Sequence, residues 1–286
     1  MSVKLKRKSI VRKKKLAASL IKYFVLVVLF VFSIFPFVWI WLTALKEPSE
    51  LLDNIFGFPA SFNWRNFTQA WVKGRFGTYF KNSIIITVPT VAGVCLFSAL
   101  AGYAFGKLKF IGRNFLFFLF LLGLMIPFQA IMVSLYYELR DLHILMTYWA
   151  AILPMAALGL PLGVFIMRAF FKGLPYELMD AALIDGCNQF GVFWRVMLPS
   201  AAPALSSVAV FQSLQSWNDF LVPLLYLQKD ELRPLTVGLM LFKGRYTINY
   251  PMLAAGATIV TLPLIIIYII FQRQFISGLT AGALKG

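Results

Sequence analysis

The chain has 286 residues, of which 60% are hydrophobic and 13% are charged, and its formal net charge is +16. Soluble domains carry about 25% charged residues, so this composition excludes an ordinary soluble domain and predicts an all-α integral membrane protein. A net charge of this size also fits a nucleic-acid-binding protein. We nevertheless expect no nucleic acid partner, because the basic residues are distributed as in a membrane protein.

Six uncharged and mainly apolar stretches reach the length of about 20 residues that a bilayer requires. They are residues 23–42, 83–106, 114–137, 144–167, 196–218 and 246–272. We therefore predict six transmembrane helices, which leave little room for a separate soluble domain.

The amino-terminal residues 1–16 form a basic tail, which we expect to be disordered until it meets lipid head groups. The first transmembrane helix is predicted at residues 17–43. A cleaved signal peptide is the alternative, but the apolar run is too long for one, and Leu42-Thr43-Ala44 is a poor cleavage site. With this tail inside the cell, the inner loops carry more Lys and Arg than the outer ones, so both termini are predicted to be cytoplasmic.

Residues 44–76 form the longest predicted external loop, and several aromatic residues lie along it. Trp64, Phe67, Trp71 and Phe76 suit the outer membrane interface, where aromatic side chains are enriched. The alternative is a surface that a solute-delivering protein contacts. The predicted core of the protein follows at residues 77–272.

Two pairs of glycines have the small-xxx-small spacing that allows helices to approach closely. Gly102 and Gly106 end the second predicted span, and Gly159 and Gly163 lie in the fourth. We use them only as indications of helix packing, because such pairs also arise by chance.

The inner loop at residues 169–199 is the longest polar interruption of the apolar core. Glu177 and Asp180 lie near the positive end of a predicted short helix, which Gly186 ends in a left-handed conformation. In a second short helix, four bulky side chains are spaced i, i+3, i+4 and i+7 and should share one face: Phe190, Phe193, Trp194 and Met197. This hairpin is predicted to dock into a partner protein. The alternative is an amphipathic hairpin on the inner leaflet, which would need more Lys and Arg.

The loop also resembles a known motif. Asp180-Ala181-Ala182, three residues, Gly186, nine residues and Val196-Met197-Leu198-Pro199 together resemble the EAA loop of ABC importer permeases. Asp180 replaces the usual Glu, and Val196 the usual Ile. Ser216-Trp217-Asn218-Asp219-Phe220 and the tail Gly278–Gly282 resemble the carbohydrate branch, the relatives of the maltose permeases.

The resemblance implies a type-1 ABC importer permease fold and a docking site for an ATPase. The expected docking residues are Glu177, Asp180, Ala181, Ala182, Gly186, Phe190, Phe193, Trp194, Met197, Leu198 and Pro199. The implied partners are a second homologous permease, an ATPase dimer and an extracytoplasmic solute-binding protein, in a bacterial or archaeal plasma membrane. The implied solute is a carbohydrate, and a polyol or glycerol phosphate is the alternative.

The fifth predicted span ends in a run of polar and amphipathic residues, which should face the bundle interior or a wet cavity. We predict that they line the substrate pathway: Gln212, Gln215, Ser216, Trp217, Asn218 and Asp219. Amides, hydroxyls and an indole suit a sugar. The alternative is a helix end that is already leaving the membrane. Residues 273–286 form the cytoplasmic carboxyl-terminal tail.

Several chemistries find no support in the sequence. No phosphate-binding Gly-x-x-x-x-Gly-Lys-Ser/Thr motif is present, so ATP is expected to bind to a partner subunit and no cofactor to this chain. No catalytic constellation or metal-ligand spacing is found, and we predict that the chain is not an enzyme. An ion-coupled secondary transporter remains the alternative, although the spans lack the ionisable residues typical of that class.

Overall fold

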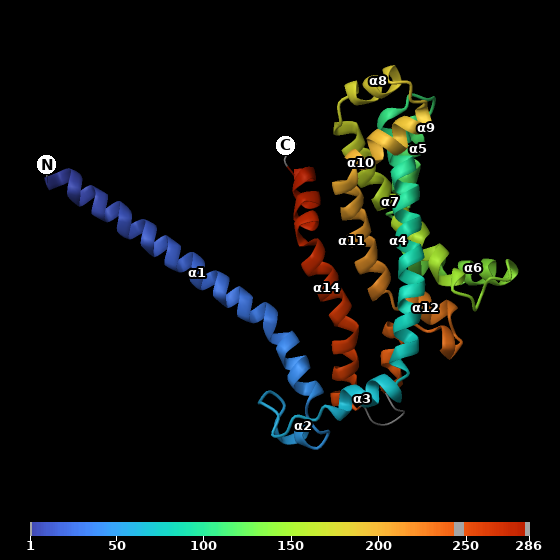
Figure 1. Ribbon diagram of the computed structural model, residues 1–286. Coiled ribbons are helices and arrows are strands. Elements are labelled where there is room, and N and C mark those ends of the chain that lie inside the picture. Colours follow the sequence, from blue (N-terminus) through green and yellow to red (C-terminus); the bar gives the residue numbers. More distant parts are fainter. Residues whose placement is uncertain (1, 243–248, 284–286) are drawn as a thin grey trace. The chain divides into compact units, whose positions relative to one another are not determined.

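The computed structural model describes residues 2–242 and 249–283, and the regular secondary structure of these residues is entirely helical (Figure 1). The longest helices are α1 (Ser2–Ala44), α4 (Phe76–Lys107), α7 (Trp149–Gly173), α11 (Ala202–Asn218) and α14 (Tyr250–Ala283). The chain divides into two compact units. The first runs to Ala70 and includes the start of α14 up to Thr258, and the second begins at Trp71 and includes the rest of α14.

Within residues 2–242 and 249–283, four helical segments are long and apolar enough to cross a membrane. They are Ser19–Ala44, Phe76–Lys107, Trp149–Gly173 and Tyr250–Gln272. A fifth crossing arises if the bent pair Gln189–Ser200 and Ala202–Asn218 is one span. Four or five of the six predicted spans are thus present as membrane-length helical segments, and the third and fifth predicted spans are interrupted.

The third predicted span, residues 114–137, is broken. Its residues form α5 (Arg113–Leu122) and α6 (Phe128–Asp141), with a non-helical connection between them. Pro127 precedes α6 in an extended conformation and lacks the N–H that would continue a helix. Gly123 follows the last residue of α5. The apolar composition of residues 114–137 indicates a membrane segment, but it does not reveal the break between α5 and α6.

The fifth predicted span, residues 196–218, is bent. The helical segment Gln189–Ser200, which ends in α10 (Leu198–Ser200), meets α11 at an angle of 73°. Ala201 lies between the two segments, with Pro199 and Pro203 on either side. The fourth span begins later than predicted, at Trp149 instead of residue 144. His143 and Met146 have left-handed φ angles of 58° and 61°, which end the preceding helix and delay the next one.

The expectation of a disordered basic tail is also wrong. α1 is continuous from Ser2, in agreement with the good helix propensity of Lys and Arg. At the other end of the chain, α14 extends beyond the predicted span to Ala283. The predicted start of the sixth span, residue 246, lies outside the described residues.

The predicted external loop holds two helices, α2 (Glu50–Asp53) and α3 (Arg65–Val72). In the first unit, the fully buried Lys46 donates from Nζ to the Asn54 carbonyl at 2.5 Å. The Asn66 amide donates to the Ala44 and Lys46 carbonyls, both at 2.8 Å. Trp64 is exposed as an interfacial residue should be.

Phe76 does not have the exposed interfacial position that the sequence suggested. It is fully buried at the first turn of α4, in the second unit. α4 packs along α7 through the predicted glycines. A Cβ atom at Gly102 would lie 2.5 Å from the Cβ of Met167, and one at Gly163 would lie 2.8 Å from that of Ser98. The two helices therefore approach at a distance that only glycine allows at these positions.

Candidate functional site

The inner loop folds as a hairpin of two short helical segments at one end of α4 and α7 (Figure 1). Its first arm is α8 (Glu177–Ile184). Gly186 has a φ angle of +85°, so the predicted left-handed turn at this residue is confirmed. The N–H of Gly186 donates to the Leu183 carbonyl and that of Cys187 to the Ala182 carbonyl, which closes the end of α8.

The second arm begins with α9 (Gln189–Gly191), where the Asn188 side chain accepts a hydrogen bond of 2.7 Å from the Gly191 N–H. It continues as a π-helix at Val192–Met197 and then as α10. π-helical turns are rare and frequently mark functional sites. Here the turn lies within the stretch that resembles the EAA loop.

The prediction that four bulky residues share one face is wrong. Phe190 and Trp194 are 68% and 41% exposed, whereas Phe193 and Met197 are 3% and 0% exposed. The hydrogen bonds of a π-helix run from i to i+5, so its turns hold more residues than those of an α-helix. Residues four apart are then the better aligned, and the set divides into an outer pair and an inner pair.

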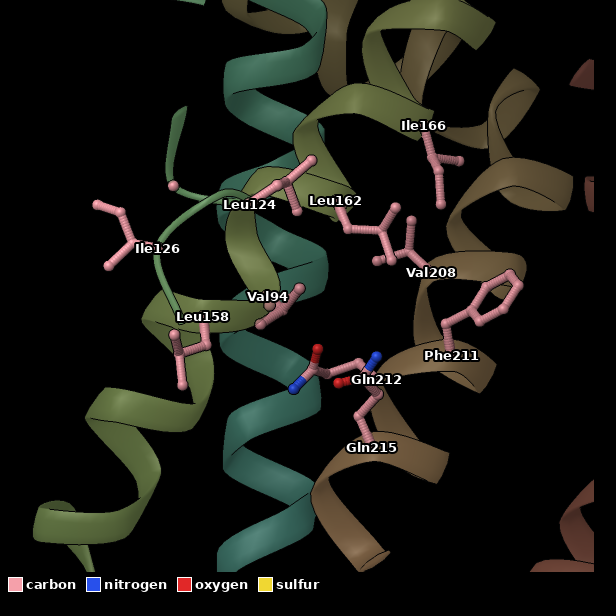
Figure 2. Close-up of a pocket in the computed structure, with 13 residues that line it drawn as sticks. Val94, Leu124, Ile126, Leu158, Leu162, Ile166, Val208, Phe211, Gln212 and Gln215 are labelled. Carbon is pink, nitrogen blue, oxygen red and sulfur yellow. The ribbon is translucent and has the colours of Figure 1, made fainter. Parts of the chain in front are cut away.

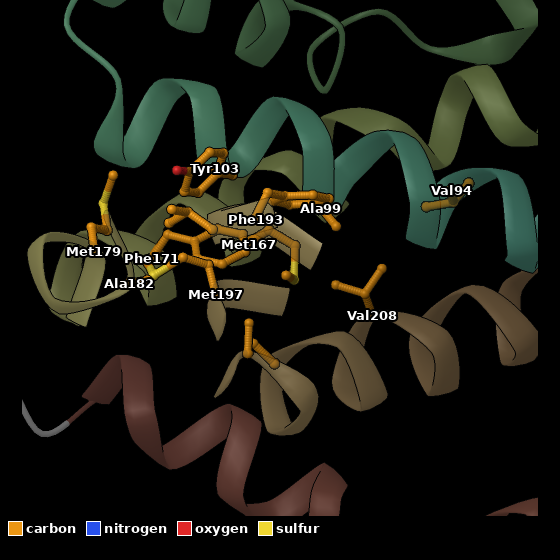
Figure 3. Packing of buried hydrophobic residues seen from close by; sticks show 13 residues of the cluster. Val94, Ala99, Tyr103, Met167, Phe171, Met179, Ala182, Phe193, Met197 and Val208 are labelled. Carbon is orange, nitrogen blue, oxygen red and sulfur yellow. The ribbon is translucent and has the colours of Figure 1, made fainter. Parts of the chain in front are cut away.

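The inner pair belongs to a buried apolar cluster that joins the hairpin to the long helices (Figure 3). The rings of Phe193 and Tyr103 lie 5.1 Å apart, and those of Tyr103 and Phe171 lie 5.6 Å apart. Met179 and Ala182 of α8 are buried in the same cluster. The hairpin is therefore packed onto α4 and α7 through its buried side chains.

Lys107, the last residue of α4, fixes the entrance of the hairpin. Its buried ammonium donates to the Leu174 carbonyl at 2.5 Å and lies 3.9 Å from the centroid of the Tyr176 ring. A carbonyl and an aromatic face together replace part of the hydration that the ammonium loses on burial.

The opposite side of the hairpin is exposed and rich in apolar side chains. Ile184 is 86% exposed, Phe190 and Trp194 are exposed as described, and the rings of these two lie 6.3 Å apart. The exposed charged residues of the hairpin include Glu177, Asp180 and Arg195. Exposed apolar groups with a polar rim are typical of protein–protein interaction sites.

The predicted pathway residues do not lie together. Gln212 and Gln215 line a cavity of about 210 Å³ between α4, α7 and α11 (Figure 2). The rest of its lining is apolar or glycine and includes Val94, Leu162 and Phe211. The cavity thus offers two amides in apolar surroundings, an arrangement that is common in small-molecule sites.

Gly159 was predicted only as a packing residue, but it also makes room for the Gln212 amide. A Cβ atom at this position would lie 2.1 Å from Gln212 Oε1. The Gln212 Nε2 donates to the Met155 carbonyl at 3.4 Å. The contact of Gly159 with Gln212 was not identified from the sequence, although the spacing of the glycines was visible there.

Ser216 and Trp217 are buried outside this cavity. Ser216 Oγ donates to Thr87 Oγ1 at 3.4 Å, and Trp217 Nε1 donates to the Val260 carbonyl at 3.0 Å. These contacts join α11 to α4 and α14. Both residues therefore have packing partners within the chain.

Asn218 and Asp219 lie at the end of α11. The Asn218 amide is exposed and donates to the Leu214 carbonyl, one turn back. Asp219 Oδ1 accepts a hydrogen bond of 3.0 Å from the Val222 N–H at the start of α12 (Leu221–Tyr226). Burial raises the pKa of the Asp219 carboxyl, and hydrogen bonds from Val222 and Leu221 counteract this effect. Asp219 thus orients the next helix and does not line the cavity.

Residues 96–280 match the family described as the binding-protein-dependent transport system inner membrane component. The chain belongs to this family. The resemblance seen in the inner loop is thereby confirmed, and the protein is a permease subunit of a transport system, located as a multi-pass protein in the plasma membrane.

Two relatives extend the match over most of the permease. An arabinooligosaccharides transport system permease protein of Halalkalibacterium halodurans is 40% identical over 259 residues, which are 89% of this chain and 92% of that protein. A diacetylchitobiose uptake system permease protein of Streptomyces coelicolor is 31% identical over 267 residues, or 93% and 88% of the two chains.

A solved structure has the same fold. It is a chain of a bacterial ABC transporter involved in the import of the acidic polysaccharide alginate, with a TM-score of 0.79 and 21% identity, and the likeness covers 90% of the permease and 96% of that chain. The permease therefore has the all-helical type-1 ABC permease fold. Within the described residues no group of three or more His, Cys, Asp or Glu side chains is placed to hold a metal ion.

Proposed function

We propose that the permease is a membrane subunit of an ABC importer that moves a carbohydrate across the plasma membrane. The names of its relatives support a carbohydrate, because they refer to arabinooligosaccharides and diacetylchitobiose. Membership of a binding-protein-dependent family argues against the ion-coupled secondary transporter. A polyol or glycerol phosphate remains the alternative solute.

The proposed complex holds a second related permease, two copies of an ATPase subunit and an extracytoplasmic solute-binding protein. ATP binds to the ATPase, and this chain has no cofactor or catalytic residue of its own. We propose six membrane crossings with both termini in the cytoplasm, where α5 with α6 and the bent α9–α11 segment are two of the six. The concentration of basic residues in the amino-terminal tail and inner loops supports this orientation.

The docking site of the ATPase is the exposed side of the hairpin. This assignment rests on the exposure of Phe190 and Trp194 and the burial of Phe193 and Met197. Trp194 is exposed and its ring lies 5.1 Å from that of the buried Phe193, which packs on Tyr103. A movement of the ATPase against Trp194 would therefore act on α4 and α7 through direct ring contacts, because the buried side chains of the hairpin pack on these two helices.

The expected docking residues then have three roles. Those that contact the ATPase are exposed: Glu177, Asp180, Ala181, Gly186, Phe190, Trp194 and Pro199. Those that hold the hairpin on the permease are buried: Ala182, Phe193 and Met197. Leu198 is half-buried where α10 leads into α11.

The proposed solute pathway on this chain passes Gln212 and Gln215. Their amides can donate to and accept from sugar hydroxyls, and Phe211 beside them offers a ring for stacking. The other predicted pathway residues make structural contacts in this conformation, so we no longer expect them to contact the solute directly.

Two single variants test the docking proposal. Trp194→Asp is expected to leave the permease folded and inserted but to remove the ATPase subunit from the complex purified in mild detergent. Phe193→Asp places a carboxylate in the apolar cluster, so it should lower the melting temperature of the permease itself. Retention of the ATPase and normal sugar uptake by Trp194→Asp would contradict the proposal.

A further inference from the structure

A second cavity, of about 490 Å³, lies beside the hairpin at the turn between α4 and α5. Lys109, Arg113, Asn114 and Tyr176 contribute to its lining. The Lys109 ammonium makes no hydrogen bond or ion pair with any residue that the structure describes. Arg113 Nη1 donates to the Leu108 carbonyl at 3.1 Å, which holds the guanidinium at the cavity.

The electrostatics of this cavity favour an anion, because Lys109 and Arg113 are the only charged residues in its lining. The ammonium of Lys107 lies 3.9 Å from the centroid of the Tyr176 ring, and the nearby Glu177 carboxylate offsets part of its charge. No carboxylate is among the lining residues, and Glu177, the residue after Tyr176, does not line the cavity. Two cations and an amide among the lining residues suit a phosphate group, which accepts several hydrogen bonds.

An apolar groove adjoins this cavity. Phe115 lines both the basic cavity and a second hollow of about 280 Å³ along α5. The remaining lining of the groove includes Phe118, Leu119, Leu122 and Met125, all of which are exposed. A charged cavity beside an apolar groove has the polarity of a phospholipid rather than of a free phosphate ion.

The length of the groove also matches a lipid. α5 has 10 residues, so it extends for about 15 Å at 1.5 Å per residue, which is half of a hydrocarbon core of about 30 Å. The break after Leu122 thus ends the helix about one leaflet deep. Lys109 and Arg113 are at the end of α5 that adjoins the hairpin, opposite the break. With the break at the middle of the bilayer, this end of α5 would lie at the level of the lipid head groups.

We propose that this site binds one anionic phospholipid, with its phosphate against Lys109 and Arg113 and one acyl chain along the Phe115–Met125 groove. The bound lipid would lie beside the turn between α4 and α5 and beside Tyr176 at the start of the hairpin. ATPase docking would then depend on the anionic lipid content of the membrane. This inference depends on the location in a membrane and not on the identity of the transported solute.

The test is native mass spectrometry of the full chain in detergent with dioleoyl phosphatidylglycerol, and with dioleoyl phosphatidylcholine as the neutral comparison. We expect phosphatidylglycerol to bind preferentially. The double variant Lys109→Gln/Arg113→Gln should weaken its binding roughly 30-fold, because each basic side chain near an anionic lipid surface contributes about a factor of five. The matched control is Lys73→Gln/Lys81→Gln, which removes two exposed lysines near the other end of α4 and should change nothing.

Two further measurements separate the other occupants. Leu122→Gln should weaken the binding of phosphatidylglycerol but not that of inorganic phosphate; equal binding of the two lipids, or full displacement by phosphate alone, would overturn the lipid assignment. The same measurement on the complete transporter should retain the lipid. Its loss there, with retention by the chain alone, would mean that a partner subunit covers the groove, and the proposal would be wrong.

Discussion

The ammonium of Lys107 donates a hydrogen bond of 2.5 Å to the carbonyl of Leu174, so the last residue of α4 holds the residue at which α7 turns into the hairpin. These two residues are far apart in the sequence. The contact fixes the start of the hairpin to the end of α4.

Replacement of Lys107 by Met should loosen the hairpin. The Leu174 carbonyl would lose a charge-assisted hydrogen bond of the kind that contributes about 1.5–3 kcal/mol. We expect a lower melting temperature in detergent and weaker ATPase binding. Lys172→Met is the matched control, because Lys172 is exposed in the last turn of α7. An equal effect of both variants would mean that loss of charge alone is responsible.

Gly102→Ala should separate α4 from α7. The added methyl group would lie 2.5 Å from Met167 Cβ and 2.9 Å from the Arg168 backbone nitrogen, and a main chain cannot move aside cheaply. Overpacking of this kind costs about 1–3 kcal/mol. Gly93→Ala, in the same helix, meets no atom within 4 Å and should be neutral or slightly stabilising. Thermal unfolding in detergent compares the two, and similar melting temperatures would refute the prediction.

Substitutions of Gly186 should affect coupling according to their tolerance of positive φ. A β-branched residue is strained by about 1–2 kcal/mol or more in the left-handed region, whereas Asn is tolerated there. Gly186→Val should therefore reduce sugar uptake far more than Gly186→Asn. A Cβ atom would meet no atom within 4 Å at this position, so the difference would report the backbone alone. Equal uptake by the two variants would argue against a required turn geometry.

Gln212→Met keeps the volume of the side chain but removes the amide from the cavity. Loss of one neutral hydrogen bond of about 0.5–1.5 kcal/mol should lower uptake about 2- to 10-fold, if the solute passes this residue. The purified complex should stay intact. The control is Asn218→Ala, which removes an exposed amide at the end of the same helix, outside the cavity. Uptake that is unchanged in Gln212→Met would exclude this residue from the pathway.

Tyr103→Phe should stabilise the permease or leave its stability unchanged. The buried Tyr103 hydroxyl has no hydrogen-bond partner within the described part of the chain, and an unpaired buried polar group costs about 1–3 kcal/mol. Tyr79→Phe is the comparison, because the Tyr79 hydroxyl donates a hydrogen bond of 2.7 Å to Asp230. This variant loses that hydrogen bond and should be less stable. A loss of transport in Tyr103→Phe without loss of stability would reveal a role for the hydroxyl in another conformation.

Local signals in the sequence predicted the parts of the site that depend on single residues. Gly186 was placed in a left-handed turn because glycine after a short helix commonly adopts it, and the structure agrees. The close approach at Gly102 and Gly163 followed from their small size in the same way.

The misplaced residues depend instead on interactions that the sequence pattern does not contain. Phe193 and Met197 were assigned to the outer face with a periodicity of 3.6 residues, but a π-helical turn changes the periodicity and buries both. Ser216 and Trp217 look like pathway residues until their partners, Thr87 and Val260, are known. Hydrophobicity alone could not reveal the break between α5 and α6, because the connection is as apolar as the helices.

The π-helical turn at Val192–Met197 also limits how this hairpin can be transferred between permeases. An engineer who wished to give another permease the ATPase preference of this one would have to move residues 189–197 as a block. Removal of one residue from this block, or its replacement by an ideal α-helix, would rotate Trp194 relative to Phe193. The exposed residues can be exchanged one by one. The buried residues depend on the spacing of the π-helical turn, so a chimera must contain this turn unchanged.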